Sequence, residues 1–454
     1  MLVPPASSPA VQRAITTWNR ILEHGDNALQ MRQELMEGVR EHGLMYGSRP
    51  ISTFLRPRFI DVTTWQQARR VGARIHVGLS RMMKSLACDP ATLELLGIRD
   101  RLADIVRDSG AVDENLYFVR LDGFLEAGVL RFVEFNADSP GGAAFVDIFA
   151  DVYAKLPVFR EFASAVPLWR RPSIPMMVAA VARAARGCGR QDPRVAVVDW
   201  AEVATVNEFH IIARELERNG FPTVVCDPRE MEICGDRLTV RGLPVDILIK
   251  RVLVTDLATR HEDSAVLCEA LRRRLVVSLN PPACQAVTPK SLFALFWEGR
   301  FDGVLGERAR AVWERHLPLT MRVREAKVRY KGDQIDVVSY VAANRERLVL
   351  KPADGWGADG VLLGWKATES QWREAVQKAL LAGDHVAQER IAIPLEDFPD
   401  ADEGALRYRT MRTEVSPYTF YPGTVCECLA RLSTNDLMNV KTGGGVVTTY
   451  VVAD

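Results

Sequence analysis

Apolar residues recur every three to four positions through most of the first 110 residues of this 454-residue chain, which is the spacing of an amphipathic α-helix. The residues in this pattern are Val11, Ala14, Ile15, Trp18, Ile21 and Leu22 in one stripe, and Trp65, Ala68, Ile75, Leu79, Met82 and Leu86 in a second. Stripes of this kind face a protein core and need no chemical role. We therefore predict a helical N-terminal region over residues 1–110.

The spacing changes to a period of two between Arg120 and Asn136, which predicts a β-hairpin with its turn near Gly128. Arg120 and Asp122 share one face of the first strand, and Glu134 and Asn136 share a face of the second. A turn at Gly128 places Asp122 opposite Glu134, and Arg120 opposite Asn136. Two carboxylates and an amide oxygen then converge on one face of the hairpin.

Carboxylate and amide oxygens are the ligands that hard divalent cations such as Mg²⁺ take, and the planar fork of an arginine can hold a phosphate or a substrate carboxylate. A surface salt-bridge ladder would show the same pattern, so the hairpin by itself leaves both interpretations open. The segment that follows, Ala137–Gly142, favours a binding site because its Ser and Gly residues permit close backbone approach to a ligand.

Apolar strands alternate with a helix from about residue 191 to 280. We predict strands over Arg194–Trp200 and Pro222–Cys226, a helix over Asn207–Asn219 between them, a hairpin over Glu232–Gly242 and a further strand over Val245–Lys250. The βαβ order predicts a parallel sheet. The three-glycine phosphate fingerprint is absent, which disfavours a dinucleotide-binding domain.

A strand that ends in Lys351 is followed by a loop containing Gly355, Gly357 and Gly360, and then by a second strand that runs to Leu363. Glycines let backbone N–H groups close over phosphates, and a lysine supplies a point charge to them. Because a strand follows the loop, it is not a Walker loop, and an ordinary glycine-rich hairpin is the alternative.

Two polar residues, Gln388 and Glu389, interrupt the apolar pattern of a strand predicted over Asp384–Arg390. A strand that contacts the edge of an adenine ring and a ribose would carry such a pair. A strand at the exposed edge of a sheet would look similar. We also predict helices near residues 290–298 and 370–382, and a final strand over Val446–Val452.

Composition and charge narrow the functional classes. Lys plus Arg and Asp plus Glu both number 58, so the net charge of +0 gives no reason to expect a nucleic acid or an anionic membrane as partner. The eight cysteines form no CxxC pair, which is typical of reduced intracellular thiols. The N-terminus has no signal-peptide pattern, and the longest apolar stretches, such as Ile174–Ala182, are shorter than the ~20 residues of a membrane span. We expect a cytoplasmic protein.

Three segments in a fixed order resemble the circularly permuted ATP-grasp proteins. They are Asn280-Pro-Pro with Thr288-Pro-Lys290, the Val349–Pro352 strand with its glycine loop, and Val386–Glu389. Within that group the chain resembles the synthetase domain of glutathionylspermidine synthase and its uncharacterised relatives, over residues 115–454. In ordinary ATP-grasp enzymes the metal-binding strand pair ends the module, whereas in the permuted group it comes first, which accounts for the early hairpin.

The resemblance implies an α+β/α/β fold, with a circularly permuted ATP-grasp module, a helical N-terminal region and a Rossmann-like βαβ subdomain. The implied units are a helical region over 1–110, the metal-binding hairpin with a helical link over 111–190, the βαβ subdomain that precedes the ATP-grasp module over 191–280, and the nucleotide-binding module over 281–454.

The activity implied by the resemblance is ATP-dependent ligation of a carboxylate to an amine. The amide forms through an acyl phosphate, ADP and phosphate are released, and the donor is an amino acid or a small peptide-like carboxylate. ATP and two Mg²⁺ ions are the implied cofactors, and a small-molecule carboxylate and amine are the implied partners. A nucleotide-binding protein without ligase activity and a small-molecule kinase of the same fold remain alternatives. The oligomeric state stays open, with a homodimer among the possibilities.

The resemblance also implies roles for individual residues. Asp122, Glu134 and Asn136 correspond to metal ligands, and Arg120 to the catalytic arginine. The implied nucleotide-binding residues are Lys290, Lys351, Gly355, Gly357, Gly360, Gln388 and Glu389. The expected substrate contacts are Ser139, Gly141, Arg412 and Arg431, with ordinary salt bridges as the alternative for the two arginines.

The chain departs from the family at one of two serine hydroxyls. The family's Ser-x-Ser after the metal strand stands here as Ser139-Pro140-Gly141, which leaves one hydroxyl and puts the substrate in doubt. The segment Lys441–Val446 resembles another glycine loop of the family, and a simple turn is the alternative there.

Overall fold

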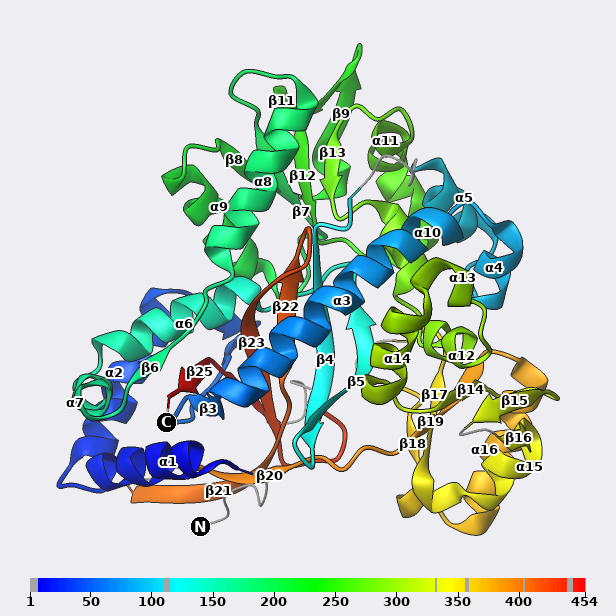
Figure 1. Ribbon diagram of the computed structural model, residues 1–454. Helices are drawn as coiled ribbons and strands as arrows, with labels where there is room; N and C mark the ends of the chain where they lie inside the picture. The colour runs from blue at the N-terminus through cyan, green and yellow to red at the C-terminus, as the bar shows by residue number, and fades with distance from the viewer. Residues whose placement is uncertain are drawn as a thin grey trace.

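An antiparallel sheet runs through the centre of the molecule, with strand order β20-β21-β23-β22-β4-β5 and with β24 paired to β23 (Figure 1). The computed structural model describes residues 7–109, 115–330, 333–355, 359–402, 405–438 and 444–453. The strands of this sheet are β4 (Phe118–Glu126), β5 (Val129–Asn136), β20 (Leu395–Asp402), β21 (Ala405–Thr413), β22 (Ser416–Phe420), β23 (Thr424–Ser433) and β24 (Gly445–Val447). The sheet therefore joins an early hairpin to the last part of the chain.

The hairpin β4–β5 has the predicted register. Arg120 pairs with Asn136, and Asp122 pairs with Glu134. The turn uses Ala127 and Gly128, both with positive φ, as a type I′ hairpin turn requires. A bulge between Asp122 and Gly123 interrupts the ladder. A Cβ at Gly123 would lie 2.7 Å from the carbonyl oxygen of Arg131, so only glycine fits the close approach of the two strands.

Helix α3 (Val62–Leu86) crosses one face of the central sheet, as Figure 1 shows, and its predicted stripe is buried there. Ile75 and Leu79 share a core with Val119 and Leu121 of β4. The other N-terminal elements are α1 (Pro9–Leu22), α2 (Asn27–Glu41), α4 (Pro90–Leu95), α5 (Asp100–Asp108), β1 (Met45–Tyr46), β2 (Arg49–Pro50) and β3 (Arg58–Asp61). The predicted helices of this region are confirmed, but the region also contributes strands.

The last strand of the chain lies in a second sheet. β25 (Thr449–Val452) is parallel to β3 on one side and antiparallel to β6 (Leu168–Trp169) on the other. The single final strand predicted over 446–452 is therefore wrong: Thr448 separates β24 from β25, and its carbonyl accepts from the backbone N–H of Arg58. Three helices link the hairpin to the next region, namely α6 (Ala143–Lys155), α7 (Pro157–Ala165) and α8 (Ile174–Cys188).

A parallel sheet with strand order β13-β12-β7-β8 confirms the predicted βαβ unit. Its strands are β7 (Val195–Val198), β8 (Thr223–Cys226), β12 (Ile247–Lys250) and β13 (Val277–Leu279), and helix α9 (Val206–Arg218) connects the first two. The same region contains β9 (Met231–Cys234), β10 (Arg237–Val240), β11 (Leu243–Val245), α10 (Val254–Thr259) and α11 (His261–Arg272).

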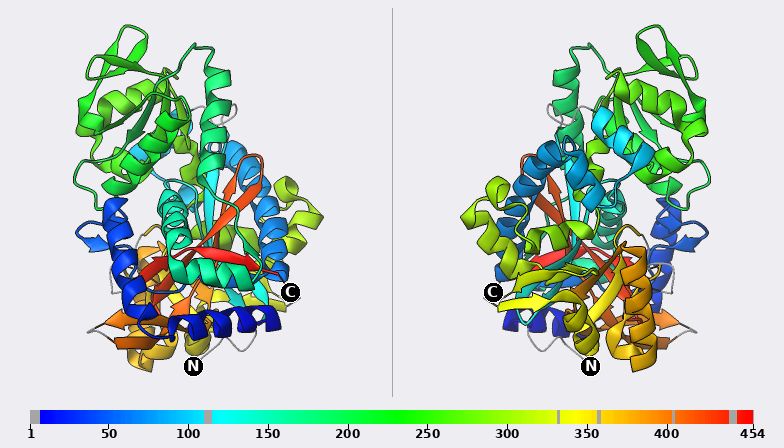
Figure 2. Two further views of the ribbon diagram at one scale, coloured as in Figure 1. Left: turned by 90° about the vertical axis from the view of Figure 1, so that its left-hand side faces the viewer. Right: turned by 90° about the vertical axis from the view of Figure 1, so that its right-hand side faces the viewer.

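A four-stranded antiparallel sheet of order β14-β19-β17-β18 forms the remaining region. Its strands are β14 (Thr320–Arg322), β17 (Leu348–Pro352), β18 (Leu362–Leu363) and β19 (His385–Glu389). Around it lie α12 (Ser291–Trp297), α13 (Asp302–Leu305), α14 (Glu307–His316), α15 (Val337–Ala343), α16 (Glu369–Ala382) and the hairpin of β15 (Lys327–Tyr330) and β16 (Asp333–Asp336). Figure 2 shows the parallel-sheet region, in green, at one end and this region, in yellow and orange, at the other.

Across the described parts of the chain, none of the helices combines the length and the apolar character that crossing a membrane requires.

Candidate active site

A cavity of about 240 Å³ lies between the hairpin β4–β5 and the β14-β19-β17-β18 sheet. The predicted site residues that line it are Arg120, Asp122, Glu134, Asn136, Lys290, Lys351, Gly355, Gln388, Glu389 and Arg431. Most of the apolar part of its wall comes from β17, β18, the turn after β18 and the segment after β19, and its residues include Val349, Leu363, Trp365, Ile391 and Ile393. Phe124 and Val133 of the hairpin, and Leu437 and Met438, also line it. One space therefore has both a charged wall and an apolar wall.

Asp122 is the most heavily paired residue of the site. Its Oδ1 accepts from Nε of Arg120 at 2.6 Å, and its Oδ2 accepts from Nη2 of Arg431 at 2.6 Å. The amide nitrogen of Asn136 donates to the same Oδ2 at 2.8 Å. Burial by itself would raise the pKa of Asp122, but the two guanidinium groups outweigh burial and lower it. Asp122 is therefore a carboxylate and not a carboxylic acid at neutral pH.

Arg431 and Arg120 extend the charge network away from Asp122. Nε of Arg431 donates to Glu414 at 2.6 Å, and Nη1 of Arg120 donates to the carbonyl of Gly141 at 2.8 Å. Burial raises the pKa of Glu414, and Arg431 opposes that rise. Arg431 lies 309 residues beyond Asp122 in sequence, and Glu414 lies 17 residues before Arg431, so sequence spacing gives no signal that the three meet.

Lys290 joins the hairpin to the glycine loop. Its Nζ lies 3.5 Å from Oε1 of Glu134 and donates to the carbonyl of Gly355 at 2.7 Å. Its backbone N–H also donates to the carbonyl of Ala353 at 2.9 Å. The lysine therefore fixes where the loop after β17 begins relative to the predicted metal ligands.

Lys351 lies at the end of β17, as predicted, and its Nζ donates to Oε1 of Gln388 at 2.7 Å. Burial, and then the positive charge of Lys290, lower the pKa of Lys351 to about 8. Two lysines close together in a partly buried cavity leave positive charge that an anionic ligand would neutralise.

Gln388 and Glu389 lie on β19, which pairs with β14 on one side and with β17 on the other. The alternative of an exposed edge strand is therefore wrong for this pair. Gln388 is buried and donates to Oγ1 of Thr320 at 3.1 Å. Glu389 lies 3.3 Å from Nη2 of Arg131 and accepts from the backbone N–H of Leu319 at 3.3 Å. Both residues line the cavity.

The remaining predicted site residues that the structure describes do not line the cavity. Gly360 lies in the turn before β18, with φ of +71°. Gly141 holds Arg120 and the hydroxyl of Tyr418 through its carbonyl, and a Cβ there would lie 2.9 Å from Arg251. Arg412 forms a salt bridge of 2.5 Å with Asp436, a residue that lines the cavity. Ser139 is half-buried in the loop after β5. Gly357, and residues 441–443 of the second glycine segment, lie outside the described residues.

Asn280 positions the hairpin, a role that the sequence did not reveal. Its side-chain oxygen accepts from the backbone N–H groups of Tyr117 and Phe118, at 2.7 and 3.1 Å. Its amide nitrogen donates to the carbonyls of Phe118 and Ala137, at 2.6 and 2.7 Å. Asn280 directly follows β13, so this one side chain ties the parallel sheet to both strands of the hairpin. In the sequence, Asn280 is marked only by the two prolines that follow it, and these do not indicate which backbone groups it binds.

The predicted metal ligands suit a hard cation. Within the described ranges, no three His, Cys, Asp or Glu side chains lie where they could hold a metal ion together, and the predicted trio contains two carboxylates and one amide. Glu134 pairs with Lys290 and with no guanidinium in the part of the chain that the structure describes. Asn136 uses its nitrogen on Asp122, which leaves its oxygen as the ligating end. The oxygens of Asp122 are shared with two arginines. The oxygen donor set is therefore compatible with Mg²⁺.

Comparisons with known proteins address the fold. No protein-family model matches the chain, and no curated protein matches it. Among solved structures, a glutathione synthetase-like effector from Globodera pallida aligns with 95% of this chain and 99% of its own, with a TM-score of 0.66 and 12% identity. A candidate gamma-glutamylcysteine synthetase from Methylobacillus flagellatus aligns with 77% of this chain and 84% of its own, with a TM-score of 0.40 and 13% identity. The chain therefore has a mixed α/β fold similar to that of the glutathione synthetase-like effector.

Proposed function

We propose that this protein is an ATP-dependent ligase that joins a carboxylate to an amine through an acyl phosphate and releases ADP and phosphate. The observation that carries the proposal is a single cavity lined by lysines and arginines suited to phosphates and by oxygen donors suited to Mg²⁺. The apolar wall of the same cavity suits a nucleotide base. The fold shared with a protein described as glutathione synthetase-like supports this class of reaction.

In this proposal the lysines and the glycine loop bind the nucleotide. Lys290 and Lys351 contact the phosphates, and Gln388 and Glu389 contact the base and the ribose. The backbone of the loop with Gly355, Gly357 and Gly360 covers the phosphates. Burial removes water from the ammonium group of Lys351 and so lowers its pKa. An anionic phosphate would stabilise the charged ammonium in place of that water, which supports this role.

Asp122, Glu134 and Asn136 would hold two Mg²⁺ ions, whose chemistry is to neutralise and orient the triphosphate. Arg120 lies on the same face and is held by Asp122, so its guanidinium is oriented before any ligand arrives. It would stabilise the charge that develops as the phosphoryl group passes to the donor carboxylate. Phosphoryl transfer of this kind depends on positioning and electrostatics, so it requires no covalent nucleophile.

The donor is an amino acid or a small peptide-like carboxylate, and Arg431 is the residue best situated to hold it. Its guanidinium lines the cavity and is fixed by Asp122 and Glu414. Ser139 and Gly141 contact the substrate from the loop after β5, and Arg412 acts through Asp436. We also propose that the ATP-grasp module is circularly permuted and that the chain consists of the four units expected from the sequence. The reason is that the hairpin comes before the nucleotide-binding module in the chain.

The test is an assay of ADP release from ATP and Mg²⁺ with pools of amino acids, short peptides and polyamines. Hydroxylamine in place of the amine is expected to give a hydroxamate, because it attacks the activated carboxylate. AMP and pyrophosphate as products would contradict the proposal, since they indicate attack on the α-phosphate. ADP with a stable phosphate ester, which hydroxylamine does not consume, would indicate a kinase instead.

A further inference from the structure

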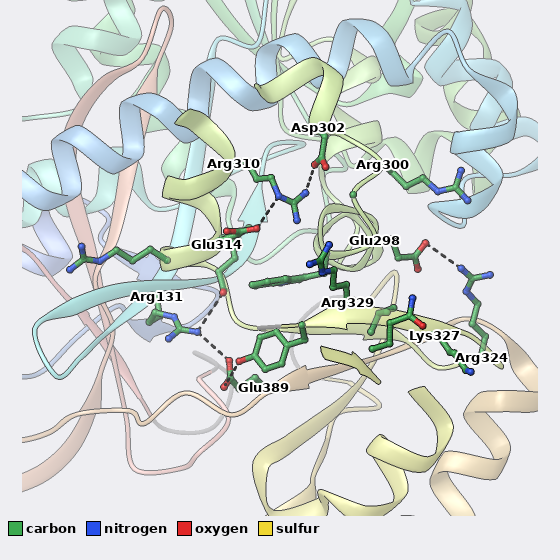
Figure 3. A pocket seen from close by; sticks show the side chains of 17 residues that line it. Arg131, Glu298, Arg300, Asp302, Arg310, Glu314, Arg324, Lys327, Arg329 and Glu389 are labelled. Atoms are coloured by element: carbon green, nitrogen blue, oxygen red, sulfur yellow. Dashed lines mark hydrogen bonds and ion pairs between the residues drawn. The ribbon is translucent and has the colours of Figure 1, made fainter. Parts of the chain in front are cut away.

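A second and larger hollow, of about 1150 Å³, lies next to the nucleotide cavity (Figure 3). Its wall comes from β5, the loop after α12, α13, α14 and the hairpin β15–β16. Glu389 of β19 lines both spaces, so the two hollows adjoin at that residue. Nothing in the proposed ligase reaction uses the second one.

Positive charge dominates this second hollow. Its cationic lining residues are Arg131, Arg300, Arg310, Arg315, Arg324, Lys327 and Arg329, against the acidic Glu298, Asp302, Glu314 and Glu389. The overall charge of the chain is +0, so the excess is local. A hollow with an excess of one sign of charge concentrates ions of the opposite sign.

The carboxylates of the second hollow are already paired. Glu298 binds Arg324 at 3.2 Å, Glu314 binds Arg310 at 2.9 Å, and Asp302 also binds Arg310. Glu389 binds Arg131.

Arg315, Lys327 and Arg329, in contrast, form no salt bridge with any residue that the structure describes. The carboxylate of Asp336, opposite Lys327 in the β15–β16 register, caps helix α15 through the backbone N–H of Ser339, and its pKa is lowered by that bond and, to a smaller degree, by the charge of Lys327.

These cations reach the hollow from separate elements. Figure 3 shows Arg310 entering from α14, Arg131 from β5, and Lys327 and Arg329 from β15, with Arg329 near the centre of the view. Lys327 and Arg329 are two residues apart on one strand and so share a face. Guanidinium groups that approach from several sides can hold more than one phosphate or carboxylate at once.

We propose that this hollow is a second binding site, for a small polyanion that carries two or more phosphate or carboxylate groups. A small molecule is favoured over a nucleic acid because the cations gather inside a concave space and do not form a stripe across a neutral surface. The site is separate from the proposed ligase chemistry, and the experiment below does not depend on that chemistry.

The probe is tripolyphosphate, with citrate as a carboxylate counterpart, titrated into the full chain by calorimetry at physiological ionic strength. Nucleotide and Mg²⁺ are left out, because a triphosphate would compete for the same cations and Mg²⁺ would chelate both probes, and Lys351→Ala is titrated in parallel to report binding in the first cavity. The wild-type protein is expected to bind one equivalent. The triple variant Arg315→Ala, Lys327→Ala, Arg329→Ala is expected to lose about tenfold or more of that affinity, because its charge-assisted hydrogen bonds are removed.

The matched control removes three exposed cations from helix α3, as Arg69→Ala, Arg70→Ala, Arg74→Ala, and is expected to bind as the wild type does. Equal losses in the two triple variants would overturn the site, because they would indicate general electrostatic attraction. Binding that disappears in Lys351→Ala but persists in the triple variant would assign the polyanion to the first cavity. Stronger binding of a DNA duplex than of either small probe would also overturn the proposal.

Discussion

Asp122 connects the predicted metal chemistry to the two arginines of the site. Its oxygens accept from Arg120, Arg431 and Asn136, so none of them faces the cavity without a partner. Glu134, by contrast, forms no ion pair with a guanidinium among the described residues; it lies 3.5 Å from Lys290, and its charge opposes the lowering of the pKa of Lys351. Glu134 is therefore the carboxylate that can accept a cation without first giving up a guanidinium.

We expect Glu134→Gln to reduce Mg²⁺-dependent ADP release by at least about a hundredfold, because an amide is a weaker ligand than a carboxylate. Thermal stability should change little, since the side chain is partly exposed and its ion pair is long. ADP release and the melting temperature are the two measurements. Glu126→Gln, on the same hairpin, is the control and should keep wild-type activity. Full activity in Glu134→Gln would refute the metal assignment.

Lys351 gives the site a pH dependence with a definite sign. Its pKa is lowered to about 8, so it loses its charge as the pH rises through that value. We expect the affinity for an ATP analogue to be weaker at pH 9 than at pH 7. Lys351→Arg stays charged in this range and should bind with nearly the same affinity at both pH values. The measurement is the dissociation constant across this range, and parallel pH profiles of the two proteins would contradict the assignment.

The stability contribution of Lys351 should change in the opposite direction. Between about 8 and the ordinary pKa of a lysine, the unfolded chain binds more protons than the folded chain. The contribution of this residue to folding stability therefore rises with pH over the range in which nucleotide affinity falls.

At the scale of elements, the hairpin depends on an anchor from another sheet. Asn280 forms four hydrogen bonds to the backbone at the start of β4 and the end of β5. We expect Asn280→Ala to lower the free energy of unfolding by about 2–4 kcal/mol, because buried backbone groups lose their partners. Chemical denaturation measures the loss. Asn219→Ala, which removes one exposed hydrogen bond, should cost less than about 0.5 kcal/mol. Similar losses in both variants would refute the anchoring role.

Sequence patterns predicted helices and strands correctly where the contacts that determine them join residues close together in the chain. The period of two gave the register of Asp122 against Glu134, because a two-residue turn fixes which residues face each other. The 3.6-residue period gave the buried face of α3. The sequence pattern does not predict the break between β24 and β25 at Thr448, because the break results from the pairing of β25 with β3, almost 400 residues away.

The candidate site was predictable only in part, for the same reason. The residues that β4, β5, β17 and β19 contribute follow from motif and spacing. The contacts of Asp122 with Arg431, and of Arg412 with Asp436, depend on how β21 and β23 pack, which a periodic pattern does not encode. The sequence also does not predict the large cationic hollow, because a net charge of +0 is a sum over the whole chain and does not show where the charges gather.

At the scale of the molecule, a buried ion pair joins the parallel sheet to the loop that leaves the hairpin. Lys250 of β12 contacts Asp138, and both side chains are fully buried. Oδ2 of Asp138 also accepts from the backbone N–H of Val254 at 2.8 Å. The pair fixes the loop between β5 and α6 against the edge of the parallel sheet.

We expect Lys250→Met to lower the free energy of unfolding by about 3–5 kcal/mol, because it leaves the carboxylate of Asp138 buried without a cation. The double variant Lys250→Met, Asp138→Asn should be more stable than Lys250→Met alone, since the second change removes the unpaired charge and keeps an acceptor for Val254. Chemical denaturation of the wild type, both single variants and the double variant completes the cycle. Additive losses would show that the two side chains are not coupled.

The pairing of β4 with β22 also sets an order of events during protein synthesis. Val119 and Thr419, which face each other in this pair, are 300 residues apart in sequence. At roughly 5–20 residues per second, the ribosome takes about 15–60 s to make the chain between them. The strand that carries Arg120 and Asp122 therefore emerges well before its partner β22, and one of its edges stays unpaired until β22 has been made. A chain stalled before residue 416 would therefore leave the backbone N–H and C=O groups of that edge open to pairing with other nascent chains.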